Sequence, residues 1–163
     1  ERAELIDGKF YDMAPPSRIH QRLVFTISRI IGNYIADHHG SCEVYPAQFA
    51  VNLDADDKDW VEPDISVICD PDKLTDRGCS GAPDLIFEIV SPSSRKLDYG
   101  IKNGIYSQSG VREYWIVDPA KERVTVYHYE EDVAPVIYSF EQDIPVGVYP
   151  GLTIKISDLL QNY

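Results

Sequence analysis

The sequence is short of cysteine and has no long apolar run. Its three cysteines, Cys42, Cys69 and Cys79, are an odd number without a Cys-x-x-Cys pair, which argues against a disulfide framework and a zinc site. Free thiols are typical of a reducing compartment, so we expect a cytoplasmic protein. No apolar stretch approaches the ~20 residues that span a bilayer, so we predict no membrane segment. The chain begins at Glu1 without Met, so the lack of a visible signal peptide carries little weight.

Positive charge is also scarce. The chain has 15 Lys and Arg residues against 27 Asp and Glu residues, a formal net charge of -12. Because neutralising phosphates supplies much of the affinity for nucleic acids, this balance argues against tight DNA binding unless a metal ion or clustered basic residues add local positive charge. Much of the excess lies in residues 54–59 and 130–132, which we predict to be solvated loops.

The length and the order of elements bound the fold. A chain of 163 residues suits one domain with a full core, so we expect residues 1–163 to form a single domain. Two helices are predicted, at 18–38 and 95–109. Turn signals and apolar alternation predict strands at 4–11 (a hairpin around Asp7-Gly8), 43–53, 61–69, 84–90, 111–118, 124–129, 136–140 and 152–156. This order is that of a mixed α/β or α+β domain.

Two of the predicted strands carry acids that need a partner. Asp64 follows Pro63 near the start of one apolar run, and Glu88 lies inside another. A buried carboxylate is costly unless it is paired, and the partner can be a basic side chain or a metal ion. If the two strands are neighbours, both carboxylates and the backbone carbonyl of Ile89 can form an oxygen-rich site that suits Mg²⁺ or Mn²⁺.

A lysine beside such a site would assist phosphodiester hydrolysis. Lys102, in the helix that follows the second acidic strand, is the first candidate to stabilise charge or position the nucleophile, and Lys96 is the second. The alternative for Lys102 is an ordinary ion pair on the helix surface with Asp98, four residues earlier. The choice depends on whether Lys102 points toward the acids.

Three further polar residues are secondary candidates. His20 lies on the apolar face of the first helix, either as a satisfied core histidine or as a metal or phosphate contact. Glu4 is either a cross-strand ion-pair partner or a third acid near the site. Gln48 lies on the less apolar face of the strand at 43–53 and is a weaker candidate of the same kind.

The pattern of Pro63-Asp64 followed by Glu88-Ile89-Val90 resembles the PD-(D/E)xK nuclease superfamily. The whole chain is more closely similar to the Uma-type family, bacterial proteins described as restriction endonucleases. The matching stretches lie at residues 4–8, 16–20, 61–67, 82–93 and 110–119. The resemblance implies a restriction-endonuclease-like core, with a central mixed sheet flanked by helices and an N-terminal hairpin. It also implies that Asp64 and Glu88 bind the metal.

One position departs from the superfamily pattern. Val90 stands where the superfamily has a lysine, and in the resembled family the lysine comes from the following helix, a position that Lys102 matches. The function implied is a metal-dependent endonuclease that hydrolyses DNA, with a homodimer expected for enzymes that cut both strands. The alternative is a catalytically inactive protein of this fold that acts as an interaction or regulatory module, which the net charge and the missing strand lysine favour.

Overall fold

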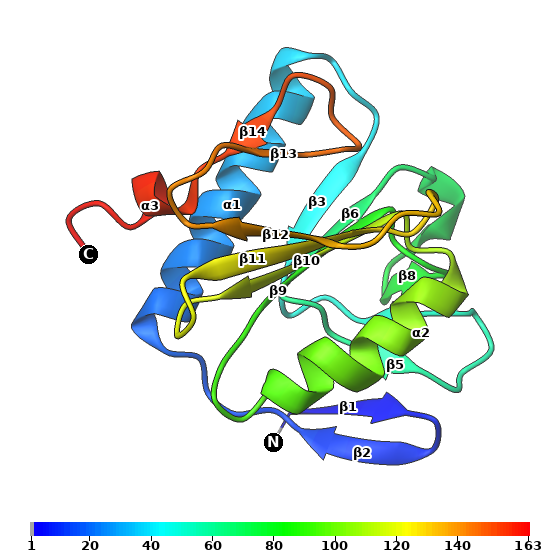
Figure 1. Cartoon of the computed structure of the whole chain (residues 1–163). Coiled ribbons are helices and arrows are strands. Elements are labelled where there is room, and N and C mark those ends of the chain that lie inside the picture. Colours follow the sequence, from blue (N-terminus) through cyan, green and yellow to red (C-terminus); the bar gives the residue numbers. More distant parts are fainter. Residues whose placement is uncertain (1) are drawn as a thin grey trace.

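The computed structural model describes residues 2–163 and contains two six-stranded sheets and a two-stranded ribbon (Figure 1). Its strands are β1 (Ala3–Ile6), β2 (Lys9–Asp12), β3 (Glu43–Pro46), β4 (Val51–Asn52), β5 (Trp60–Val61), β6 (Ile65–Ile68), β7 (Leu74–Thr75), β8 (Gly78–Ser80), β9 (Leu85–Ile89), β10 (Glu113–Asp118), β11 (Arg123–His128), β12 (Val136–Ser139), β13 (Ile144–Pro145) and β14 (Thr153–Ile154). Its helical segments are α1 (Arg18–Asp37), the 3₁₀ turn η1 (Pro71–Lys73), the π-helical turn η2 (Leu97–Ile101), α2 (Lys102–Ser109) and α3 (Ile156–Leu159).

The main sheet is mixed and has the order β12-β11-β10-β9-β6-β3. Strands β9 and β10 are parallel, and the other neighbours are antiparallel. The second sheet has the order β2-β1-β5-β4-β8-β7, so the N-terminal hairpin forms its edge. The prediction of a mixed α/β fold, with a central mixed sheet, flanking helices and an N-terminal hairpin, is confirmed.

The two faces of the main sheet build two hydrophobic cores. Because side chains alternate along a strand, Leu85, Phe87 and Ile89 of β9 pack with α1, while Ile86 points to the opposite face. That opposite face packs against Tyr106 of α2 and against the second sheet. Glu88 is therefore directed toward the α2 side of the sheet, where the N-terminal hairpin also lies (Figure 1).

The turn and capping residues predicted from the sequence lie where expected in the N-terminal hairpin and in α1. Asp7 and Gly8 both have positive φ, 48° and 75°, as expected for the tight turn of a hairpin. Ser17 caps α1, because its side chain accepts a hydrogen bond from the backbone N–H of His20. Helix α1 ends at Asp37, one residue before the predicted boundary.

Two predicted strands are divided between the sheets. The run at 43–53 forms β3 in the main sheet and β4 in the second sheet, so Gln48 lies in the connection rather than in a strand. The run at 61–69 divides into β5 and β6 in the same way, with Asp64 just before β6. Apolar residues continue to alternate through each break, although β3 is exposed or half-buried and β4 is buried, so the sequence pattern does not mark the change of sheet.

The prediction that the cysteines form no disulfide is wrong, because Cys42 and Cys69 are joined by one. Strands β3 and β6 pair antiparallel with Glu43 opposite Ile68, so the residues just beyond that pair meet side by side. This register cannot be read from cysteine spacing. The expectation of a reducing compartment rested on free thiols, and among the described residues only Cys79 is one. Within residues 2–163, no helix is both long and apolar enough to cross a membrane.

Candidate active site

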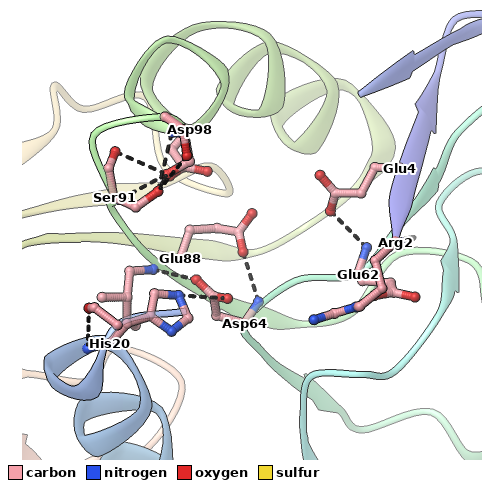
Figure 2. Close-up of polar contacts among 12 residues, drawn as sticks. Arg2, Glu4, His20, Glu62, Asp64, Glu88, Ser91 and Asp98 are labelled. Carbon is pink, nitrogen blue, oxygen red and sulfur yellow. Dashed lines mark hydrogen bonds and ion pairs between the residues drawn. The ribbon is translucent and has the colours of Figure 1, made fainter. Parts of the chain in front are cut away.

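Asp64 and Glu88 meet at one end of the main sheet. Strands β6 and β9 are antiparallel with Ile65 opposite Phe87, so the residue before β6 lies opposite Glu88. The backbone N–H of Asp64 donates to Glu88 Oε1 at 2.8 Å, and the backbone N–H of Ile89 donates to Asp64 Oδ2 at 2.7 Å (Figure 2). The two acids predicted from the sequence are therefore adjacent.

The Ile89 carbonyl faces the same edge of β9. The N–H of the next residue, Val90, donates to the Val117 carbonyl of β10 at 2.8 Å. Peptide groups alternate between the two sides of a strand, so the N–H and carbonyl of Ile89 face away from β10. Asp64 accepts the hydrogen bond from the N–H on that side. The carbonyl of Ile89 thus lies on the side of the strand where the two carboxylates meet.

Lys102 lies between two buried glutamates. Its Nζ donates to Glu4 Oε1 at 2.8 Å and also to Glu88 Oε2. The side chain is only 4% exposed, so the alternative of a surface ion pair with Asp98 is wrong. Tyr106, one turn further along α2, donates from its hydroxyl to Glu88 Oε2 at 3.3 Å. Helix α2 and the hairpin strand β1 thus meet over Glu88.

An ion pair between the half-buried Arg95 and the buried Asp118 anchors the helical segment that carries Lys102. Arg95 contacts both carboxylate oxygens of Asp118, at 2.6 and 3.0 Å, at the end of β10. Tyr99 donates its hydroxyl to the same carboxylate at 2.8 Å. The π-helical turn η2 follows Arg95 and leads directly into α2. This anchor ties the start of the helix to the main sheet next to the acids.

His20 contacts Asp64 from the first turn of α1 (Figure 2). Its Nε2 lies 3.1 Å from Asp64 Oδ1. Its Nδ1 is buried and has no hydrogen-bond partner among the described residues. Burial by itself would lower the pKa of His20, but the hydrogen bond to Asp64 and the charge of that carboxylate raise it above 6.5. His20 is therefore a polar contact of Asp64 as well as a residue on the apolar face of α1.

Burial and crowding shift the pKa values of this cluster. Burial raises the pKa of Glu88 well above its ordinary value; the charge of Lys102 opposes the shift and that of Asp64 adds to it. Burial would lower the pKa of Lys102, but the charges of Glu88, Glu4 and Asp98 raise it well above its ordinary value. Lys102 is therefore a stable cation at neutral pH, and its contribution is electrostatic rather than that of a proton acceptor.

Sequence reasoning did not assign Asp98 to the site. This residue is buried, and its Oδ2 accepts a hydrogen bond from Ser94 Oγ at 2.6 Å. Burial raises the pKa of Asp98 to about 6. The spacing of Asp98, Lys102 and Tyr106, each four residues apart, is the signal that could have found all three on one helix face.

A pocket of about 560 Å³ opens above the acids. Asp64, Glu88, Lys102, Glu4 and His20 all line it. Two other candidates differ in their placement. Gln48 is exposed at the pocket wall, from the connection between β3 and β4. Lys96 is exposed and does not line the pocket, so the structure brings only the first of the two candidate lysines to the acids.

The donor set fits a hard divalent cation. The carboxylates of Glu4 and Glu88 contact the single ammonium of Lys102, and Asp64 lies next to Glu88, so acidic side chains outnumber the lysine in this cluster. Within residues 2–163, no group of three or more His, Cys, Asp and Glu side chains is placed so that it could hold a metal ion. Mg²⁺ does not require such a group, because it is commonly held by one or two carboxylates and keeps several waters. The two carboxylates and the Ile89 carbonyl meet that requirement.

The mixed α/β fold is shared with a protein of known structure. A crystal structure described as "a putative nuclease belonging to DUF820", from Anabaena variabilis, matches with a TM-score of 0.76. The match covers 96% of this chain and 88% of the other, at 20% sequence identity. At this identity the likeness shows the fold alone, which is a mixed α/β fold.

The chain belongs to the Uma2 family, whose model is described as "Putative restriction endonuclease" and matches residues 1–157. The family predicted from the sequence motifs is thereby confirmed. Two relatives from Synechocystis sp. are both described as uncharacterized proteins. The first, slr1290, is 26% identical over 133 residues, which is 81% of this chain and 68% of that protein. The second, sll1609, is 30% identical over 130 residues, which is 78% and 72% of the two chains.

Proposed function

We propose that this protein is a Mg²⁺- or Mn²⁺-dependent endonuclease that hydrolyses phosphodiester bonds in DNA. The observation that carries the proposal is the adjacency of Asp64 and Glu88 in the lining of a pocket, with Lys102 in contact with Glu88. Membership of a family described as restriction endonucleases and a nuclease-like fold both support it. Acid pairs that hold a metal beside a phosphate are a general solution for this hydrolysis.

Each residue has a role that follows from its contacts. Asp64, Glu88 and the Ile89 carbonyl would hold the metal, which when bound lowers the pKa of a water and polarises the phosphate. Lys102 keeps a positive charge next to the negative charge that develops on the phosphate. Glu4 acts through Lys102, because it fixes the ammonium from the hairpin side, and is a positioning residue. His20 orients Asp64 from α1.

Cleavage assays with single variants test this assignment. Supercoiled plasmid and single-stranded DNA are incubated with the protein and Mg²⁺ or Mn²⁺, and products are followed on gels. Asp64→Asn and Glu88→Gln should each lower the rate at least about a hundredfold, since even the outer partners of metal ligands cost 10- to 100-fold. Glu141→Gln, a change of an exposed acid, is the matched control and should keep the wild-type rate. Equal rates in all four proteins would refute the proposal.

A second candidate function is an inactive protein of this fold that serves as an interaction or regulatory module. The pairing of Glu88 with Lys102 favours it, because that ion pair satisfies a buried acid without any metal. Calorimetric titration with Mn²⁺ separates the two candidates. Binding by the wild type that is lost in Glu88→Gln supports the nuclease, and no binding to either protein supports the module.

The setting proposed with this function is a cytoplasmic homodimer. Closed pairs are common among enzymes that cut both strands of a duplex, which supports the dimer. The Cys42–Cys69 disulfide counts against a reducing compartment. Light scattering of the purified protein tests the dimer, and mass spectrometry of thiols alkylated in intact cells tests the redox state of the two cysteines.

A further inference from the structure

We propose that the pocket receives an unpaired strand of DNA, in a single-stranded region, a gap or a frayed end, rather than an intact duplex. This inference rests on the nuclease function proposed above and adds the class of substrate. Three observations carry it: the burial of the acids, the charge of the pocket wall and the neutral groups in its lining.

The two acids line the pocket and are largely shielded from solvent. Glu88 is 1% exposed, and the side chain of Asp64 is 14% exposed. A scissile phosphate must therefore enter the 560 Å³ pocket to reach them. A duplex is stiff over about 150 base pairs and carries both backbones on the outside of a wide, regular helix, so it is poorly shaped to bring a single phosphate into a pocket of this size. A single strand bends freely enough to do so.

The charge of the pocket wall also disfavours a duplex. Six of the described residues that line the pocket are acids: Glu4, Asp12, Glu62, Asp64, Glu88 and Asp98. The basic lining residues are Arg2, His20 and Lys102, and each has an acid partner in the pocket, namely Glu62, Asp64 and the Glu4–Glu88 pair, respectively. A duplex carries one charge per about 1.7 Å of axis, twice the density of a single strand, and would be repelled more strongly.

Neutral groups around the pocket suit the exposed face and edges of an unpaired base. Met13, Pro15 and Pro16, from the connection between β2 and α1, give an apolar wall. Gln48 and Ser91 add an amide and a hydroxyl, which can form hydrogen bonds with base edges or sugars. Duplex binding depends mainly on basic residues that contact phosphates. The described lining residues include only three basic side chains, each paired with an acid, whereas these neutral groups can contact an unpaired base.

A cleavage series with matched oligonucleotides tests the inference. One labelled strand is presented alone, in a full duplex and in a duplex with a short unpaired gap, together with bis(p-nitrophenyl) phosphate as a small phosphodiester. Because a duplex must first be unpaired at a cost of a few kcal/mol, the free strand should be cut at least about tenfold faster. The gapped duplex should be cut only where it is unpaired.

The outcomes separate this inference from the proposed function. Cleavage of the duplex as fast as the free strand, with loss of both activities in Glu88→Gln, overturns the substrate class and leaves the nuclease standing. No cleavage of any oligonucleotide and no hydrolysis of the small phosphodiester overturn both. Cleavage of the small phosphodiester alone overturns the single-strand assignment.

The dependence of KM on salt is an independent readout. If one or two cations contact phosphates, KM for the single strand should rise only about three- to sevenfold between 50 and 200 mM salt. A duplex groove with six to ten phosphate contacts would instead lose about 10³- to 10⁵-fold in affinity over that range. A steep dependence of that kind would overturn the inference.

Discussion

Two buried glutamates on neighbouring parallel strands differ in the groups around them and in the size of the adjacent cavity. Glu88 of β9 is 1% exposed, and Glu113 of β10 is 2% exposed. Glu88 lies on the α2 side of the main sheet, next to a second acid, a buried lysine and the 560 Å³ pocket. Glu113 lies beside a hollow of only about 60 Å³. Burial of an acid is therefore common to both regions and does not by itself identify the site.

The partners of Glu113 satisfy it without leaving room for a substrate. Its Oε2 accepts a hydrogen bond from Trp115 Nε1 at 2.6 Å, and Oε1 lies 3.4 Å from His128 Nδ1. The loop at Gly147 closes over this carboxylate, since a Cβ there would lie 2.3 Å from Glu113 Oε1. Glu113 of β10 thus packs against the loop that contains Gly147. The comparison teaches that a second carboxylate and a cavity, rather than a buried charge, distinguish the candidate site.

The largest expected effect comes from removing the cation of the first cluster. Lys102→Met leaves Glu88 and Glu4 buried without their positive partner, and loss of one member of a buried pair costs about 3–5 kcal/mol. Urea denaturation measures the free energy of unfolding. A loss below about 1 kcal/mol would show that the acids are already neutral or hydrated, and the contrast with Glu113 would disappear.

The second expected effect is a pH dependence of the free energy of unfolding that is caused by Asp98, which lines the pocket. Burial raises the folded-state pKa of Asp98 to about 6 from 3.8; the charge of Lys102 opposes the shift, and the charges of Asp64 and Glu4 add to it. The native state then binds more protons than the unfolded chain between these values, so the free energy of unfolding falls as pH rises from 4 to 6. Asp98→Asn should remove up to about 3 kcal/mol of this decline. Glu141→Gln is the control and should keep the slope, as measured by urea denaturation at each pH.

A third test asks which glutamate responds to metal. Mn²⁺ at 100 times its Kd should stabilise the wild type by about 2.7 kcal/mol, because it binds only the folded state. The gain should vanish in Glu88→Gln and persist in Glu113→Gln, as measured by the urea midpoint with and without Mn²⁺. A gain that is lost equally in both variants would assign the effect to general destabilisation.

The smallest expected change in the free energy of unfolding comes from replacing His128. Its side chain is 24% exposed and its contact with Glu113 is long, so His128→Gln should cost less than about 1 kcal/mol. Trp115 still donates to the carboxylate in that variant. The same denaturation measurement applies, and a loss as large as that of Lys102→Met would mean that the two clusters depend equally on their cations.

Much of the local structure was predictable because its causes are local. Helix α1 follows from an apolar stripe and the Ser17 cap, and the first hairpin follows from Asp7-Gly8. Glu88 could be singled out because an acid inside an apolar strand needs a partner. Glu113 begins an equally buried strand but was not singled out, since an acid at the start of a strand is commonly exposed to solvent.

The sequence by itself determined the two main helices, the first hairpin, the family and the two candidate acids, because periodicity, turn residues and motifs act over short distances. The tertiary structure decided which of these meet. It placed Lys102, and not Lys96, against Glu88, divided two apolar runs between different sheets, and joined Cys42 to Cys69. These outcomes depend on strand register and on the packing of α2 against the hairpin, which bring together residues far apart in the sequence.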